Sequence, residues 1–223
     1  MFERSKIELP QCNLTLNEET HTYKNDLGLI IPSVHDVIFP VSNSVYGQFG
    51  SLSDAQTKGT LVHLGIELYE QLGVNTVPEE YSGYLDAYKK FVEDNEKKYR
   101  LVANEYKVYN KALNYCGTID KILEDVETGE LVIVDYKTGA KKEYATLQLQ
   151  LAGYKMALDT IIAGLGLKTG DTRLLKLNRD KTYEFESIVA HTGDFVSCWS
   201  VYCYCKKYIN GFGNKPNIKI ETI

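Results

Sequence analysis

The chain has 223 residues, which falls between one large domain and two small ones because domains contain about 100–200 residues. Apolar residues make up 43% and charged residues 25%, an ordinary globular composition that excludes wholesale disorder. No stretch reaches the roughly 20 apolar residues of a membrane span, and the N-terminal segment lacks the apolar region of a signal peptide. We therefore expect a cytoplasmic protein with no membrane association. The five cysteines, an odd number, fit that reducing compartment.

The charge is unevenly distributed along the chain. The net charge of −5 means that the surface as a whole does not indicate binding to nucleic acid. Between Lys137 and Lys181, however, nine Lys and Arg residues accompany only four Asp and Glu residues. A local basic strip can bind a polyanion by neutralising its phosphates. The alternative is a helix face with solvated lysines, and on charge alone this alternative ranks first.

The N-terminal half contains one hairpin signal followed by helix signals. Residues 14–31 alternate apolar and polar side chains around Asn25-Asp26-Leu27-Gly28, which predicts a β-hairpin. Start and stop signals then predict helices over about 33–39, 53–73 and 79–98. In the second helix, one leucine stripe predicts the buried face: Leu61, Leu64, Leu68 and Leu72. In the third helix, the residues predicted to face inward are Tyr84, Leu85, Tyr88, Phe91 and Val92.

The second half changes to the period of strands. The pattern predicts strands over 100–109, 113–124 and 131–138, a helix over about 143–163, strands near 172–178 and 182–189, and a helix over about 192–210. This order predicts a single α/β domain over 1–223 with a mixed central sheet flanked by helices. Within it we expect an N-terminal extension over about 1–50, a core over about 51–190 and a C-terminal helix over about 191–212.

Two carboxylates and one lysine lie on adjacent strands of the predicted sheet. Asp120 lies in one strand, and Asp135 lies at the polar end of the apolar strand that follows. Lys137 is two residues beyond Asp135, so both side chains leave the same face of their strand. Paired carboxylates suit Mg²⁺ or Mn²⁺, and a neighbouring lysine can orient a water molecule or stabilise charge on a phosphate. The alternative is that these residues mark only the solvent-facing end of a central strand.

Further pairs flank this group in the chain. Gln150 and Tyr154 are four residues apart on the helix that follows Lys137, so they project from one face. His63 and Glu67 have the same spacing on the helix that begins near residue 53. Each pair alone is usually structural. Their order along the chain forms a more specific pattern.

That pattern resembles the PD-(D/E)XK nuclease superfamily, in particular the branch with the RecB nuclease domain and many phage exonucleases. The segments that carry the resemblance are GTLVH (59–63), GTID (117–120), VDYKTG (134–139) and QLQLAGY (148–154). The opening TYKNDLGLIIPSVHDVI also looks like the start of phage members. The resemblance implies a restriction-endonuclease-like core. It also implies a metal-dependent DNA exonuclease, of phage or of recombination and repair type, that hydrolyses phosphodiester bonds.

The resemblance also implies a role for each matching residue. Asp120, Asp135, the backbone carbonyl of Tyr136 and His63 would bind the metal. The nitrogen ligand would favour Mn²⁺ over Mg²⁺. Lys137 would act on the attacking water. Gln150 and Tyr154 would position DNA, with the basic strip offering further contacts from Lys141, Lys142 and Lys155. Glu105 and Glu67 are second-rank candidates, and for Glu67 a solvated helix face is an equal alternative.

Other features of the branch are missing or undecided. Some members hold a four-cysteine iron–sulfur cluster, but the spacing of Cys198, Cys203 and Cys205 fits such a cluster poorly, so no iron–sulfur cluster is expected. Two other functions stay open: an endonuclease of the same superfamily, and a DNA-binding module whose catalysis has lapsed. A recombination partner protein, a homo-oligomer, and a host-cytoplasm location for a phage-encoded enzyme are further expectations.

Overall fold

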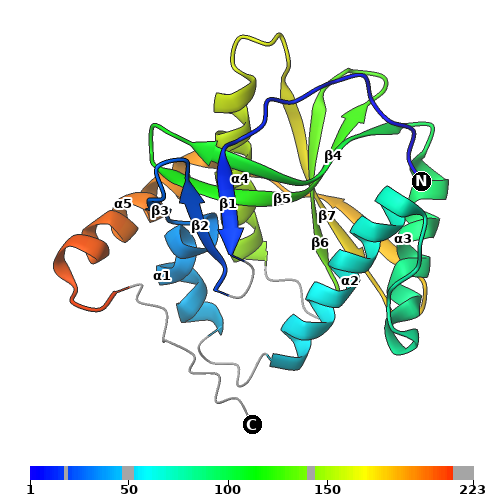
Figure 1. Ribbon diagram of the computed structural model, residues 1–223, viewed down its shortest axis with the longest axis horizontal. Coiled ribbons are helices and arrows are strands. Elements are labelled where there is room, and N and C mark those ends of the chain that lie inside the picture. Colours follow the sequence, from blue (N-terminus) through cyan, green and yellow to red (C-terminus); the bar gives the residue numbers. More distant parts are fainter. Residues whose placement is uncertain (18–19, 47–52, 140–143, 213–223) are drawn as a thin grey trace.

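A five-stranded mixed sheet forms the centre of the molecule (Figure 1). The computed structural model describes residues 1–17, 20–46, 53–139 and 144–212, without the side chains of residues 43–46, 53–57 and 144. The sheet has the order β4 (Tyr99–Asn110), β5 (Tyr115–Asp125), β6 (Leu131–Lys137), β7 (Thr169–Leu177) and β8 (Tyr183–Ser187). Only β6 and β7 pair in parallel, and the other neighbours are antiparallel. The predicted mixed sheet, with three strands consecutive in the chain (β4, β5 and β6), is therefore confirmed.

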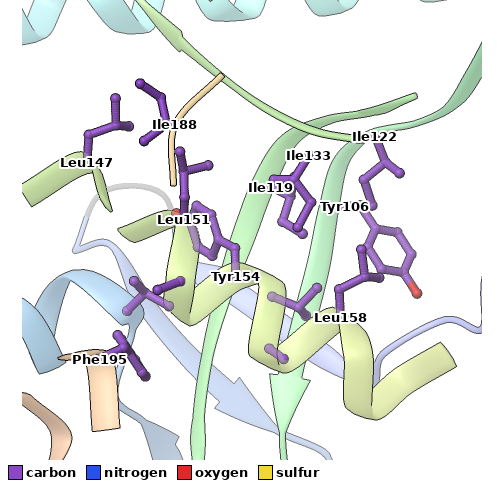
Figure 2. Close-up of a cluster of buried hydrophobic side chains, with 14 of the residues drawn as sticks. Tyr106, Ile119, Ile122, Ile133, Leu147, Leu151, Tyr154, Leu158, Ile188 and Phe195 are labelled. Atoms are coloured by element: carbon purple, nitrogen blue, oxygen red, sulfur yellow. The ribbon is translucent and has the colours of Figure 1, made fainter. Parts of the chain in front are cut away.

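Helices cover both faces of this sheet (Figure 1). One hydrophobic core lies against α1 (Val34–Tyr46), α4 (Tyr144–Ile162) and α5 (Thr192–Tyr208), and it includes Leu151, Leu158 and Phe195 (Figure 2). A second core lies against α2 (Ser53–Leu72), the short 3₁₀ turn η1 (Glu79–Tyr81) and α3 (Ser82–Asn95). Strand β6 lies between these cores and is buried on both faces, which explains its continuous apolar run.

A small antiparallel sheet precedes α1. Its strands are β1 (Leu14–Asn17), β2 (Thr22–Asn25) and β3 (Ile30–Ile31), and the predicted turn at Asn25–Gly28 joins the last two. Ser33 caps α1, because its Oγ accepts a hydrogen bond from the Asp36 backbone N–H at 3.1 Å. The predicted end at residue 39 is wrong, since α1 continues through Pro40. Burial of Val37 and Ile38 against α4 and α5 outweighs the backbone hydrogen bond that proline removes.

Helix α2 ends as predicted but buries a different face. Gly73 follows it with φ +70°, a left-handed conformation that glycine adopts without strain. The leucine stripe is not the buried face, because Leu64 is 48% exposed and Leu72 is 67% exposed. Val62 and Ile66 are buried instead, and Gly65 lets the helix closely approach Val77, in the loop between α2 and η1. The predicted cap by Ser53 and Gln56 involves side chains outside the described residues.

Most other predicted packing is confirmed. All five residues expected to face inward from α3 are buried: Tyr84, Leu85, Tyr88, Phe91 and Val92.

Within the described residues, the structure has no helix long and apolar enough to cross a membrane.

Candidate active site

Strands β5 and β6 separate at the point where each carries an aspartate. Their pairing runs from Glu124–Leu131 to Lys121–Val134. Asp120 and Asp135 are the next residues on the two strands, so they face each other where the pairing ends. We call this opening between β5 and β6, flanked by Asp120 and Asp135, the fork. The Tyr136 backbone N–H donates a hydrogen bond to Asp120 Oδ2 at 2.7 Å. An oxygen of the Asp120 carboxylate thus accepts the hydrogen bond that a backbone carbonyl would accept in a regular ladder. The Asp120 side chain therefore lies between the two strands at the fork.

Asp120 also meets the imidazole carried by α2. His63 Nδ1 lies 3.8 Å from Asp120 Oδ2, and the His63 ring packs edge-on against Tyr136 with 5.5 Å between ring centres. Withdrawal from water raises the pKa of Asp120. His63 partly opposes this shift, and the negative charge of Asp135 adds to it. The two carboxylates repel each other when both are ionised, and a nitrogen donor lies beside them. A bound cation would therefore stabilise this site.

Glu105 joins this group through an unusual backbone conformation. It has φ +45°, which is uncommon for a residue other than glycine. The ladder between β4 and β5 passes from Asn104–Lys121 to Tyr106–Ile119 without a pair at Glu105 and Asp120. A left-handed residue of this kind costs about 1–3 kcal/mol, and such strain collects at functional sites.

Three side chains converge closely enough to share one metal ion. One ligand atom from each of His63, Glu105 and Asp120 lies within 4.8 Å of the other two. The set contains one nitrogen and two carboxylates, a donor combination that suits Mn²⁺ and also accepts Mg²⁺. The second-rank candidate Glu105 therefore belongs to the candidate metal group.

Asp135 is held from two sides. Gln150 Nε2 donates a hydrogen bond to Asp135 Oδ1 at 2.7 Å, and Lys137 Nζ lies 2.6 Å from Oδ2. Among the described residues, no contact to the buried Oδ2 has the geometry of a hydrogen bond. The prediction that Asp135 and Lys137 share one face of β6 is confirmed. The alternative, in which these residues mark only a solvent-facing strand end, does not hold for Asp135, which is only 2% exposed.

Tyr154 packs deep in the core behind Asp135. Its hydroxyl lies 3.3 Å from Gln150 Nε2, and its ring lies among aliphatic side chains of the first core (Figure 2). Gly117 makes this position possible, since a Cβ there would lie 2.6 Å from Tyr154 Cε1. The glycine of the GTID segment therefore admits the tyrosine of the QLQLAGY segment against β5. Gln150 and Tyr154 are both buried in this structure and support Asp135 from behind.

Some of the predicted site residues lie elsewhere. Glu67 accepts a hydrogen bond from Gln71 Nε2 at 2.9 Å and is not part of the converging metal group. Lys155 Nζ lies 3.0 Å from Asp159 Oδ2 and 3.2 Å from the Thr169 carbonyl oxygen. Thr169 pairs with Leu131 at the start of β6, whereas Asp135 and Lys137 lie at its end. The structure therefore does not bring Lys155 to the fork. Lys141 and Lys142 lie outside the described residues.

One histidine near the fork was missed in the sequence. His35 lies on the first turn of α1 and keeps solvent-exposed surface. The protein atoms around the ring and the positive charge of Lys137 lower the pKa of His35. The signal was its place two residues after Ser33, in the segment that looks like the start of phage nucleases. Without a partner at helical spacing, that position did not distinguish His35 from a surface residue.

The family comparison matches the segment that carries the fork. The model of the PD-(D/E)XK nuclease superfamily matches residues 80–194, just over half of the 223 residues. The chain belongs to the PD-(D/E)XK nuclease superfamily. The match does not separate the branches of this superfamily, so the resemblance to RecB-like and phage exonucleases stays a prediction.

Neither of two further comparisons adds to this assignment. The crystal structure of the protein SSO0001 aligns with a TM-score of 0.40 and 13% sequence identity, over 78% of this chain and 75% of that chain. No curated protein sequence matches the chain significantly.

Membership of the PD-(D/E)XK superfamily identifies the architecture as a restriction-endonuclease-like fold. It implies a nuclease with DNA as substrate and a divalent metal as cofactor. The residues present fit such a metal. His63, Glu105 and Asp120 converge, and the buried Asp135 Oδ2 has no hydrogen bond within the described part of the chain.

Proposed function

We propose that this protein is a metal-dependent DNA exonuclease that hydrolyses phosphodiester bonds. The observation that supports it most is the convergence of His63, Glu105 and Asp120 beside the Asp135–Lys137 pair. A surface carboxylate cluster alone would be weak support. Here the acidic side chains meet a nitrogen donor on one side and a lysine on the other, and Glu105, Asp120, Asp135 and Lys137 lie within the segment that matches the superfamily.

The metal would be Mg²⁺ or Mn²⁺. His63, Glu105, Asp120 and Asp135 are the side chains that would hold it, with the Tyr136 carbonyl oxygen as a further ligand. The imidazole nitrogen favours Mn²⁺. When bound, a divalent cation stabilises charge on the phosphate and lowers the pKa of a bound water.

The neighbouring side chains would act on the water and on the carboxylates. Lys137 would orient the attacking water or stabilise the charge that develops on the phosphate. Its contact with Asp135 keeps the ammonium group beside the fork. Gln150 would hold Asp135 in one orientation through their hydrogen bond. Tyr154 would support Gln150 from the core.

The choice of exonuclease over endonuclease rests on the resemblance to one branch of the superfamily. The His63 helix and the Gln150/Tyr154 pair look like elements of the exonuclease branch, which includes enzymes of phages and of recombination and repair. A same-superfamily endonuclease is the second candidate. A lapsed DNA-binding module is less well supported, because Asp120, Asp135 and Lys137 are all present.

The deciding experiment compares a covalently closed circular DNA with the same DNA linearised. Separate reactions contain EDTA, Mg²⁺ or Mn²⁺, and labels at the 5′ or 3′ end report the polarity. We expect the linear DNA to be consumed only with metal and the circle to resist. Rapid nicking of the circle would establish an endonuclease. Undiminished digestion in EDTA would overturn the metal-dependent function, and binding without any cleavage would establish the lapsed module.

A further inference from the structure

A buried polar cluster lies behind the fork, on the side of α2 and α3. Lys121 Nζ donates a hydrogen bond to Asn104 Oδ1 at 2.5 Å and lies 4.0 Å from Glu70 Oε1. The Tyr88 hydroxyl donates a short hydrogen bond to the same Glu70 oxygen. The side chains of Lys121 and Glu70 are 0% and 1% exposed. The cluster therefore contains a fully buried pair of opposite charges with directional partners.

This pair joins the two elements that carry the candidate ligands. Lys121 directly follows Asp120 on β5. Glu70 lies seven residues after His63 on α2, which is about 10 Å along the helix axis and about 20° around it. Strand β5 and helix α2 thus meet twice. His63 and Asp120 meet at the fork at 3.8 Å, and Glu70 and Lys121 meet in the interior at 4.0 Å.

Near the start of α2, Lys58 Nζ donates hydrogen bonds to the Tyr84 hydroxyl at 3.4 Å and to the Thr138 carbonyl oxygen at 3.1 Å. The fully buried contacts of α2 other than those of Glu70 are less directional. Val62 and Ile66 pack in the second core, and Gly65 lets the helix approach Val77. Apolar burial is non-directional, so it permits small rotations and shifts of a helix on its support. A buried ion pair is weak support for stability, since well-packed apolar residues often replace one without loss. Stability therefore does not explain why a glutamate lies on this apolar face of α2.

We propose that Glu70, held by Lys121 and Tyr88, is a positioning residue that fixes α2 so that His63 reaches the metal group. This inference rests on the proposed function. Rotating α2 by about 20° would move a ring nitrogen about 6 Å from the helix axis by about 2 Å. A misplacement of about 1 Å in a catalytic group can cost about 10²-fold in rate. The directional contacts of Glu70 resist that movement.

The main test replaces the pair by apolar residues, in the double variant Glu70→Leu/Lys121→Met. Single variants would leave one buried charge without its partner, so the double variant is the informative one. We expect it to fold cooperatively with an unchanged or higher thermal midpoint. Mn²⁺ affinity, measured on the protein without DNA by electron paramagnetic resonance, should fall at least about 10-fold. The kcat for linear DNA should fall more than the KM rises.

Two companion variants separate positioning from stability. Ile66→Val, on the same buried face of α2, should lower the thermal midpoint and leave the Mn²⁺ affinity unchanged. Tyr88→Phe removes only the hydroxyl that reaches Glu70, and it should weaken Mn²⁺ binding several-fold while the protein stays folded. If the double variant does not fold, Tyr88→Phe decides the question.

The outcomes distinguish this inference from the proposed function. A folded double variant that binds Mn²⁺ like the unaltered protein would overturn the positioning role, as would unchanged affinity in Tyr88→Phe when the double variant does not fold. His63→Ala serves as the reference. If His63→Ala and the unaltered protein bind Mn²⁺ equally, His63 is not a ligand and the proposed metal site itself fails. If His63→Ala loses affinity and the cluster variants do not, only the positioning role is lost.

Discussion

Gln150 donates a hydrogen bond to Asp135 across 2.7 Å, and this contact joins helix α4 to the end of strand β6. Both side chains are buried, so the orientation of Asp135 is set from the interior of the protein. The other carboxylate oxygen lies 2.6 Å from Lys137. One oxygen is thus fixed by the core while the other lies beside the ammonium group that would act on the phosphate.

The first prediction concerns this contact. Changing Gln150 to Leu removes the donor and leaves a buried carboxylate oxygen without its partner. We expect a loss of about 1–3 kcal/mol in the free energy of unfolding, measured by urea titration, and weaker Mn²⁺ binding. Gln148→Leu, the same substitution two residues earlier on α4, is the matched control. Equal losses in both variants would show that the Gln150–Asp135 contact has no special role.

The second prediction concerns Lys137. Lys137→Ala should lower the rate of DNA digestion by at least about 10²-fold, a typical loss for an electrostatic or acid–base group. Metal binding should persist, because the proposed ligands are unchanged. Lys90→Ala, which removes an exposed lysine paired with Asp94 on α3, should digest DNA normally. A Lys137→Ala protein with full activity would remove the lysine from the mechanism.

The strands that carry Asp120 and Asp135 could be predicted because their signal is local. A strand has a period of two, so Asp135 and Lys137 must share a face, and the apolar run before them identifies a central strand. The buried face of α2 could not be predicted in the same way. Its sequence offers a leucine stripe and a Val62–Ile66 face, and helical periodicity alone does not choose between them. Packing in the second core, against residues of α3 and the central sheet, makes the choice.

The site was predictable only in part for a similar reason. The roles given to Asp120, Asp135 and Lys137 came from motif residues, and the structure brings these residues together. Glu105 could be assigned to the metal group only from the backbone conformation, because the local sequence does not predict its left-handed φ. The proximity of His35 to Lys137 could be recognised only from the topology. The fold brings the start of α1 to Lys137, although about 100 residues separate them in the chain.

The third prediction concerns charge at the fork. Burial raises the pKa of Asp120, so the folded protein binds a proton there more tightly than the unfolded chain. The stability linked to this group is present at low pH and is lost as pH rises through the folded pKa, so at neutral pH the ionised carboxylate destabilises the metal-free fold. Asp120→Asn should therefore raise the thermal midpoint of the metal-free protein at pH 7.

The same variant should lose its response to metal. Saturating Mn²⁺ at 100 times its Kd would stabilise the unaltered protein by about 2.7 kcal/mol, and Asp120→Asn should show much less stabilisation. The asparagine oxygen can still accept the hydrogen bond from the Tyr136 N–H, so the fork should keep its shape. A metal-free Asp120→Asn protein that is less stable than the unaltered one at pH 7 would contradict the sign given to this group.

The last prediction separates strain from function at Glu105. Its φ of +45° disfavours any side chain with a Cβ, and glycine adopts this conformation without that penalty. Glu105→Gly should therefore be more stable than Glu105→Ala by about 1 kcal/mol in urea unfolding of the metal-free protein. Both variants lack the carboxylate, so both should bind Mn²⁺ more weakly than the unaltered protein by the same factor. That combination would mean that the left-handed backbone is kept for the ligand and not for the fold. Equal stability of the two variants would remove the strain argument, and normal Mn²⁺ affinity in both would remove Glu105 from the metal group.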